Sequence, residues 1–556
     1  ARNIDMQLTG NLDSSGNVIA KDTAAITANN VNNTGTIYGN FVAIKANNDL
    51  INHGTMYANS AMGLDAKNRI MSQSLTTTQT NTQGRSSSSR TDISQIATIS
   101  VGTGLKDSTD ENGKPLTTLS LRGNQIIYQS VNTDNAGGST QMTAQNGIDI
   151  GTVTVSNHIS AVADDNNYFK YNQTQDVGSN ISSYGDTVIA TTGQGADITG
   201  KAANIRSGGV SAIIATGGVH FSEGHATSST QSSSTHQESK WYGSKDITST
   251  HESSSNTAVL SSIDGDEVYV VSSDSDIDLI GTNINADKQV SLKAEQGSVT
   301  LQSAIDSVYQ NNTKTTQNFY KNTGNVDGFY QETLAQTGVR AGSVDIQGNS
   351  ANLNGVSLQA THGPITVGNA HLATNDDGTL KLDDNGKPIV LSGDMQHLNL
   401  GTVDLTNETW QESSKSYRGL AKDLMKGVGV VAGASGIGND ITLAKSQSNR
   451  TTDHMQAVTK LNANQIYLGA SEVTATGTIL DAGDDGFVRV LGDDVLFTTA
   501  KHSQSNTQTQ TRQTITGEGM KLGRDHLQLG AVAYTDSTDT QSTQSTTHDG
   551  VTVRGN

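Results

Sequence analysis

Short apolar stretches, separated by Asn- and Gly-rich corners, alternate through the first 70 residues. The segments "NLDSSGNVIA", "NVNNTGTIYG" and "DLINHGTMYA" align so that Gly16, Gly35 and Gly54 follow one another at intervals of 19 residues. A period near 20 is too short for a repeated helical hairpin, whereas alternation of apolar and polar positions suits short strands joined by tight turns. Each period therefore predicts one coil of a parallel β-helix.

In such a coil, alternate side chains point into the lumen and neighbouring coils stack about 4.8 Å apart. The positions expected to point inward are Ile26, Val31, Ile37, Ile44, Leu50, Met56, Leu64 and Ile70. Asn and Gly at the corners are expected to adopt the left-handed backbone conformations of sharp bends. The handedness preference of parallel crossovers predicts a right-handed coil.

The same pattern returns later with looser spacing. Strand-sized pieces begin at Ile277 and Val299, 22 residues apart, and at Val344 and Ile365, 21 residues apart. A coil of three short strands still fits these intervals. We therefore predict an all-β fold, a right-handed parallel β-helix of about 20 residues per coil that continues through the whole chain.

Polar tracts rich in Ser, Thr and Gln interrupt this pattern. Thr favours strands, whereas a flexible linker would favour Gly and Ser alone, and most tracts have a polar counterpart downstream. They are therefore interpreted as antiparallel hairpins that leave the coil and return, with disorder as the alternative. The hairpins are expected near residues 72–100, 166–184, 225–257, 307–338, 408–458 and 501–549.

The aromatic residues favour ordered hairpins over disorder. Thirteen of the 23 aromatic side chains fall in or beside the polar tracts, whereas disordered segments are depleted in aromatics. The rings either pack the hairpins onto the solenoid, which is the commoner fate of large apolar groups, or face a partner. Trp241, Tyr242, Phe329 and Tyr330 are the aromatic candidates for partner or membrane contact.

The most apolar uncharged window is "GVGVVAGASGIG", which begins at Gly427. Its glycines do not make a nucleotide loop, because no Lys-Ser or Lys-Thr ending follows. Twelve residues are too few to span a bilayer as a helix, but a tip between two polar arms could lie on or insert into one. Val428, Val430, Val431 and Ile437 are therefore further candidates for membrane contact, with packing on the solenoid as the alternative.

Composition supports a thin-cored fold. Only 33% of the 556 residues are hydrophobic and 16% are charged, which is too polar for a thick globular core but sufficient for a solenoid. The net charge of −19, without a basic stripe, argues against nucleic-acid binding. The absence of cysteine excludes disulfides and thiolate metal sites, and it is compatible with an exported bacterial surface protein. The first residues, "ARNIDMQLTG", carry no export signal, so we expect the chain to be an internal piece of a longer protein.

Candidate catalytic chemistry is sparse. Some β-helices are carbohydrate-active enzymes, and glycosidic cleavage needs an acid and a base across the bond. Asp274, Asp276 and Asp278 lie at alternate positions, but no matching set occurs one coil later, so a solvated strand edge is favoured. The Asp-rich turns lack the spacing of calcium loops, and the histidines lack metal-ligand spacing. We expect no catalytic residue, no cofactor and no metal site.

Two segments resemble known repeat classes. "NVNNTGTIYG" resembles the first repeat class of filamentous haemagglutinin-type exoproteins. "SDIDLIGTNINADKQVSLKAEQGSVTLQSAIDSVYQ" resembles the second class, which is shared with contact-dependent growth inhibition effectors. The resemblance divides the chain into first-class coils over residues 1–71 and second-class repeats with hairpins over residues 72–556.

The resemblance implies a secreted cell-surface filament of a Gram-negative bacterium. Its implied partners are an outer-membrane two-partner secretion transporter and the surface of a target or host cell, with contact to an outer membrane as a further expectation. In growth-inhibition effectors the second repeat class is associated with delivery of a C-terminal toxin across the target-cell outer membrane; in haemagglutinins such filaments act in adhesion. We therefore expect a non-enzymatic segment for cell–cell contact and toxin delivery, with a passive adhesin stalk as the first alternative and a carbohydrate-active enzyme as the second.

Overall fold

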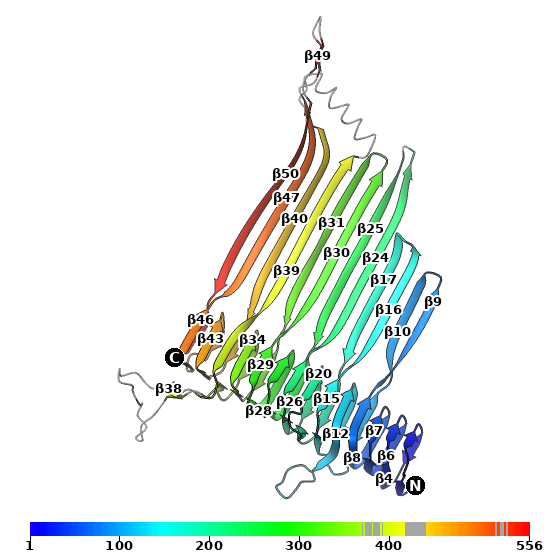
Figure 1. Ribbon diagram of the computed structural model, residues 1–556, viewed down its shortest axis with the longest axis vertical. Coiled ribbons are helices and arrows are strands. Elements are labelled where there is room, and N and C mark those ends of the chain that lie inside the picture. The colour runs from blue at the N-terminus through cyan, green and yellow to red at the C-terminus, as the bar shows by residue number, and fades with distance from the viewer. Residues whose placement is uncertain are drawn as a thin grey trace.

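Three parallel β-sheets wind the chain into a solenoid, and a separate antiparallel sheet stands on one corner of it (Figure 1). The computed structural model describes residues 1–241, 243–369, 371–372, 381, 390–391, 393–417, 441–517, 520–522, 527–529 and 532–555. None of these residues lies in a helix. The predicted parallel β-helix with antiparallel hairpins is confirmed.

Each coil contributes one strand, or one part of a longer strand, to each of the three sheets. The first sheet contains β1 (Ile4–Gln7), β4 (Thr23–Ala28), β6 (Thr36–Ala46), β8 (Thr55–Gln73), β12 (Thr117–Gln129), β14 (Ser139–Ala144), β19 (Thr187–Thr191), β22 (Val210–Ala215), β26 (Ser261–Ser272), β28 (Thr282–Ala294), β33 (Ser343–Gln347), β36 (Ile365–Val367), β42 (Gln465–Gly469) and β45 (Phe487–Leu491). The second contains β2 (Leu12–Ser14), β5 (Val31–Asn33), β7 (Asp49–Asn52), the ends of β8 and β12, β15 (Ile148–Gly151), β20 (Ile198–Lys201), β23 (Val219–Ser222), β27 (Ile277–Ile280), β29 (Ser298–Gln302), β34 (Ser350–Asn354), the start of β39 (His397–Tyr417), β43 (Glu472–Thr476) and β46 (Asp494–Thr498). The third contains β3 (Asn17–Ile19), the starts of β6 and β8, β11 (Ala97–Val101), β13 (Val131–Asn135), β18 (Asn180–Ser183), β21 (Asn204–Ser207), the starts of β26 and β28, β32 (Gly338–Ala341), β35 (Ser357–Ala360), β41 (Lys460–Asn462), β44 (Ile479–Asp481) and β51 (Thr552–Arg554).

The lumen holds one continuous core of Ile, Leu, Val, Met and Ala. Val31 pairs with Leu12 on one side and with Leu50 on the other, so the period of 19 seen in the sequence is the register of the coils. All eight predicted inward side chains are at most 2% exposed. Alternation of apolar and polar residues is therefore sufficient to identify the interior.

The corner glycines are required for a different reason from the one expected. Gly16, Gly35 and Gly54 are not among the residues with positive φ. Instead, a Cβ atom on Gly35 would collide with the carbonyl oxygen of Gly16, and one on Gly54 with that of Gly35. The glycines permit close stacking of one corner on the next, so the prediction of left-handed conformations there is wrong.

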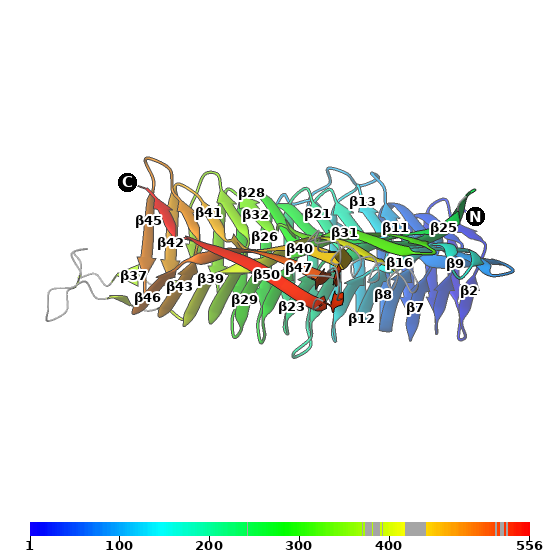
Figure 2. The same ribbon diagram turned by 90° about the horizontal axis from the view of Figure 1, so that it is seen from above.

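Within the described ranges, six hairpins leave the solenoid at the same corner, each after a strand of the second sheet and before a strand of the third. They pair side by side into one antiparallel sheet, which we call the fin (Figures 1 and 2). Its strands, in order, are β9 (Leu75–Gln83), β10 (Ser86–Gln95), β16 (Val153–Asp164), β17 (Asn167–Val177), β24 (Gly224–Lys240), β25 (Gly243–Val259), β30 (Ala304–Asn318), β31 (Lys321–Ala335), β39 beyond Gly401, β40 (Ile441–Val458), β47 (Ala500–Gly517) and β50 (Val532–Asp549). Two short pairs lie apart from both bodies: β37 (His371–Leu372) with β38 (Val390–Leu391), and β48 (Met520–Leu522) with β49 (Leu527–Leu529).

From β8 onward, every second coil carries a hairpin, and this spacing explains the continuous fin. Two hairpin arms occupy about 9.6 Å, because hydrogen-bonded strands lie about 4.8 Å apart. Two coils of the solenoid rise by the same amount, since their strands are also hydrogen-bonded neighbours. Successive hairpins are therefore spaced so that they hydrogen-bond to one another without a change in the twist of the solenoid or in the spacing of the fin strands.

One hairpin begins earlier than the polar tract that pointed to it. The tract at residues 166–184 contains only the return arm, whereas the hairpin runs from Val153 to Val177. Its outgoing arm, β16, includes Val153, Val155 and Ile159 and therefore resembles a solenoid strand in sequence. A search for polar tracts does not detect an apolar hairpin arm of this kind.

Buried hydroxyl groups hold the corner where the hairpins return. The Ser261 hydroxyl accepts a hydrogen bond from the Ala203 amide (3.0 Å) and donates one to the Ser222 carbonyl (2.8 Å). Ser179 and Thr337 occupy the same position after their own hairpins and make the same pair of contacts. All three are fully buried, so each hydroxyl satisfies a backbone amide that the departing hairpin would otherwise leave unpaired.

Candidate functional site

The fin presents two different surfaces to solvent. Directly opposed residues of an antiparallel pair share a face, so the register assigns every fin residue to one side. One side, which we call the hydroxyl face, carries threonine pairs such as Thr235 and Thr248, whose hydroxyls lie 2.8 Å apart. The other side, the amide face, carries Asn and Gln side chains, among them Gln411 and Asn449 on neighbouring strands. Because charges are sparse over the fin, contact with a partner would depend on hydrogen bonding and on a few local clusters.

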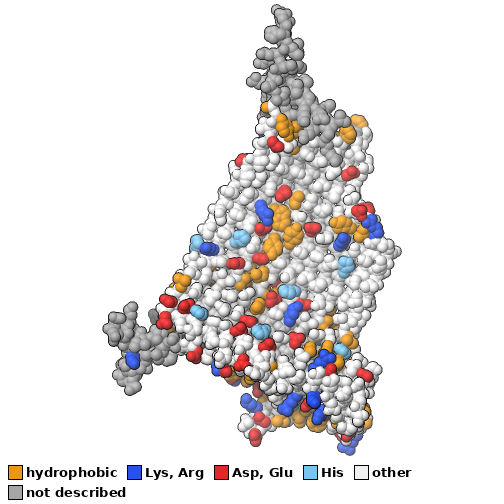
Figure 3. Space-filling model, in the orientation of Figure 1, with side chains coloured by type: hydrophobic (Ala, Val, Ile, Leu, Met, Phe, Trp, Pro, Cys, Tyr) orange, Lys and Arg blue, Asp and Glu red, His pale blue; other side chains and the backbone are white. Residues whose placement is uncertain are grey.

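Hydrophobic side chains gather in the middle of the fin, over β31 and β39 (Figure 3). On the hydroxyl face, the Trp410 ring covers Gly328 and lies 5.7 Å, between centroids, from the Tyr309 ring. The Trp410 indole donates a hydrogen bond to Asn311 Oδ1 at 3.0 Å. These contacts join three strands, so Trp410 stabilises the packing of neighbouring hairpins rather than the attachment of a hairpin to the solenoid.

Phe329 and Tyr330 lie on opposite faces, because side chains alternate along a strand. The Tyr330 hydroxyl, on the hydroxyl face, donates a hydrogen bond to Glu332 Oε1 at 2.6 Å, and this contact raises the pKa of Tyr330. Phe329 is on the amide face and lines a shallow pocket of about 400 Å³ together with Asp327 and Gln411. The two residues therefore cannot act together on one surface of a partner.

The pocket beside Phe329 also contains an unpartnered polar atom. Asn449 Oδ1 is buried without a hydrogen-bond partner in the structure, as is Asn506 Oδ1 on the adjacent strand β47. Asn312, on the far side of the pocket, donates to Asp327 (3.1 Å) and contacts His251 Nδ1 (2.7 Å). The pocket is therefore a polar depression with two aromatic lining residues, Phe329 and Trp410.

Of the candidate contact residues expected at hairpin ends, the structure describes one. Trp241 occupies the turn between β24 and β25 and is 96% exposed, so it does not pack on the solenoid. The other five candidates, Tyr242, Val428, Val430, Val431 and Ile437, lie outside the described residues.

Sequence reasoning missed the turn next to Trp241. Phe319 and Tyr320 join β30 to β31 and are 82% and 51% exposed. Since β25 pairs with β30, the two aromatic turns belong to neighbouring hairpins. The signal was present in the sequence, because "KWYG" and "NFYK" are the two places where adjacent aromatics separate long polar arms.

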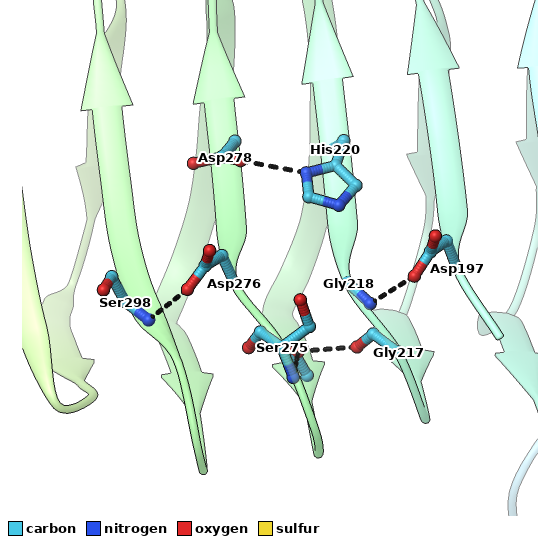
Figure 4. A network of polar contacts seen from close by, with 9 residues as sticks. Asp197, Gly217, Gly218, His220, Ser275, Asp276, Asp278 and Ser298 are labelled. Atoms are coloured by element: carbon cyan, nitrogen blue, oxygen red, sulfur yellow. Dashed lines mark hydrogen bonds and ion pairs between the residues drawn. The ribbon is translucent and has the colours of Figure 1, made fainter. Parts of the chain in front are cut away.

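Asp276 and Asp278, two of the three carboxylates considered for catalysis, serve the stacking of coils (Figure 4), whereas Asp274 is exposed. Asp276 Oδ1 accepts a hydrogen bond from the Ser298 amide of the next coil at 2.7 Å, and Asp278 Oδ2 lies 3.0 Å from His220 Nδ1. Asp197 accepts in the same way from the Gly218 amide at 2.6 Å. These side chains connect neighbouring coils, and no group of three His, Asp or Glu suited to a metal ion occurs within the described ranges.

Asp176 fixes the foot of the fin. Its carboxylate receives the Lys201 ammonium of the solenoid at 2.8 Å, the Thr154 hydroxyl at 2.7 Å and the His225 amide at 3.1 Å. Burial opposes ionisation of this carboxyl, but the bonds from Lys201, Thr154 and His225 outweigh it and lower the pKa of Asp176. One carboxylate thus joins three fin strands to the body.

The described residues include no helix of a length and apolar character that would cross a bilayer. Neither the curated proteins nor the solved structures yield a match to the chain. Residues 242–381 match the family model of the hemagglutinin repeat, over a region that includes β25, β30, β31 and the solenoid strands between β26 and β36. This match supports a filamentous, adhesin-like role and a structural rather than a catalytic one.

Proposed function

We propose that the chain is an extracellular segment of a secreted bacterial surface filament, and that it mediates cell–cell contact and supports delivery of a C-terminal toxin across the outer membrane of a target cell. The hemagglutinin repeat supports the filament. An outer-membrane two-partner secretion transporter and the target-cell surface are the proposed partners.

The fin is the observation that carries this proposal. A stalk that only spans distance needs coils and nothing else, yet six hairpins are committed to a sheet with both faces in solvent. Its arms are 9 to 18 residues long, as in β9 and β40, so the fin extends far from the solenoid. The fin has the extent and exposure needed to meet a second surface.

Passive adhesion is the second candidate function. The aromatic turn at Trp241 and the pocket beside Phe329 are both suited to contact with a cell surface, and neither requires a toxin. Adhesion requires only attachment to the target cell, whereas delivery also requires that the target cell is killed. Separate assays of attachment and killing therefore distinguish the two.

The test is deletion of residues 418–438 from the full-length protein, followed by separate assays of attachment and target-cell killing. Loss of killing with attachment intact supports delivery, and loss of both supports adhesion as the primary role. A matched control deletes residues 108–114, which form a loop on the solenoid between β11 and β12. Unchanged attachment and killing in the 418–438 deletion would contradict a functional role for the end of the fin.

A further inference from the structure

Three cations lie in one row across the fin. Lys415 of β39 is directly opposite Lys445 of β40, and Lys445 is directly opposite Arg512 of β47. Side chains opposed in this way are about 5 Å apart at Cβ, and like charges there repel one another. We call these three residues the basic row.

Among the described residues of the fin, the row lacks nearby carboxylates that would offset the repulsion. Its lateral neighbours are Thr323 on β31 and Ser537 on β50. The acid nearest by register on the same face is Asp539, which is opposite Gln510 and only diagonal to Arg512. Natural strands usually avoid directly opposed like charges, so this arrangement is suited to an anion supplied from outside.

The cationic groups remain accessible. All three side chains are exposed, and none takes part in an ion pair with any residue the structure describes. The Arg512 Nε donates to Thr442 Oγ1 at 3.1 Å, and the Lys415 ammonium lies 5.3 Å from the centroid of the Tyr417 ring. The outer guanidinium nitrogens of Arg512 can therefore still bind a phosphate with two parallel hydrogen bonds.

The basic row lies toward the end of the fin remote from the solenoid: Lys415 is two residues before the end of β39 and Lys445 is four residues after the start of β40, whereas β47 continues for five residues beyond Arg512. Lys415 is directly opposite Thr323, which is three residues from Tyr320 along the chain. The exposed turn between β30 and β31 therefore extends about 10 Å beyond the row. Aromatic rings favour the boundary between lipid headgroups and acyl chains, and amphipathic elements reach about 5–10 Å into it. A lipid surface could thus meet the rings of Trp241, Phe319 and Tyr320 and bring its phosphates to the level of the basic row, with the paired ends of β47 and β50 reaching further into it.

We propose that the basic row binds the phosphate groups of a lipid surface, with the exposed aromatic turns of the neighbouring hairpins entering the headgroup layer. This inference rests on the proposed cell-contact function and names the chemistry of its partner. Three cations at one height match a planar array of anions, and this geometry favours a membrane over an isolated anion.

The test is flotation of the full-length protein with vesicles of phosphatidylcholine, either alone or mixed with phosphatidic acid. The wild-type protein should prefer the phosphatidic acid vesicles, and added salt should weaken the preference because it screens exposed charges. The triple variant Lys415→Gln/Lys445→Gln/Arg512→Gln should lose roughly a hundredfold in affinity for these vesicles, since each basic residue near an anionic surface contributes about fivefold. Trp241→Ala/Phe319→Ala should weaken binding to both kinds of vesicle.

A matched control removes the same charge elsewhere. Lys21→Gln/Lys45→Gln/Lys67→Gln replaces three exposed lysines of the solenoid and should bind like the wild type. Equal loss in both triple variants would overturn the proposal, because net charge would then explain the binding. Binding of the wild type to inorganic polyphosphate or heparin but not to vesicles would also overturn it, in favour of a soluble polyanion.

Folding and function are monitored separately. Removal of the basic row relieves repulsion, so the triple variant should melt at or slightly above the wild-type temperature. Vesicle binding decides this inference, whereas attachment and killing by the 418–438 deletion decide the proposed function. Either one can therefore fail while the other stands.

Discussion

The Asp176 carboxylate at the foot of the fin and the Lys201 ammonium of the solenoid form an ion pair of 2.8 Å. The side chain of Asp176 is only 10% exposed, and it also accepts hydrogen bonds from Thr154 and from the His225 amide. Fin and solenoid are thus joined electrostatically where β16 and β24 leave the coil and β17 returns to it.

Replacement Asp176→Asn should destabilise the protein by about 1–3 kcal/mol, because Lys201 and the other donors lose a charged acceptor. Thermal unfolding measures this loss. Asp165→Asn is the control, since its ion pair with Arg85 is highly exposed and such pairs contribute little. Equal effects of the two substitutions would contradict the importance of the joint.

Stability should also depend on acidity through the same residue. The pKa of Asp176 is lower in the folded protein than the ordinary carboxyl value of 3.8. Its contribution is therefore complete above pH 3.8 and is lost as the pH falls through the lower folded value. Denaturant titrations of the wild type and Asp176→Asn should converge at acidic pH, and a constant difference at all pH values would contradict this assignment.

Ser261→Ala should destabilise the corner at which β25 returns to the solenoid. It removes the hydrogen-bond acceptor of the Ala203 amide at a fully buried site and leaves that amide unpaired, at a cost of about 1–3 kcal/mol, whereas the Ser222 carbonyl keeps its bond from the Ala202 amide. Hydrogen exchange should accelerate at the start of β26. Ser239→Ala, an exposed change on β24, is the control and should leave exchange there unchanged.

Gly328→Ala should displace the Trp410 ring. A Cβ atom at Gly328 would lie 2.5 Å from Trp410 Cζ2 and would also collide with the Gln310 carbonyl oxygen. In a Trp241→Phe background, where Trp410 is the remaining tryptophan, the emission of Trp410 should shift to longer wavelength and the melting temperature should fall. Gly324→Ala on the same strand meets only the flexible Ser414 hydroxyl, at 2.9 Å, and should have the smaller effect.

The solenoid could be predicted residue by residue because its information is local. Ile26, Val31 and Leu50 each lie at one of the alternating positions of a short repeat. Alternate side chains of such a coil all point into the lumen, so these residues are buried. Asp276 was less accessible to prediction, because its partner is the Ser298 amide, 22 residues away in the next coil. A carboxylate that looks available in the sequence is thus engaged in stacking.

The candidate site was predictable only in part. Adjacent aromatics between polar arms pointed to Trp241 at a hairpin turn, and the turn is there. That Phe329 and Tyr330 lie on opposite faces follows from the alternation of side chains along a strand. The residues next to each of them across the sheet depend on which hairpins pair with one another. The basic row shows this dependence most clearly, since Lys415, Lys445 and Arg512 are remote in sequence and adjacent only across three strands.

The sequence by itself determined that the chain coils into a thin-cored parallel β-helix, that polar hairpins leave it, and that one of them turns at Trp241. These features depend on the period of apolar residues and on turn chemistry, which act over a few residues. Only the tertiary structure decided that the hairpins join into one fin and that each fin residue has a face. The reason is geometric: two coils and two hairpin arms rise by the same distance, and this equality appears only when coils are stacked in space.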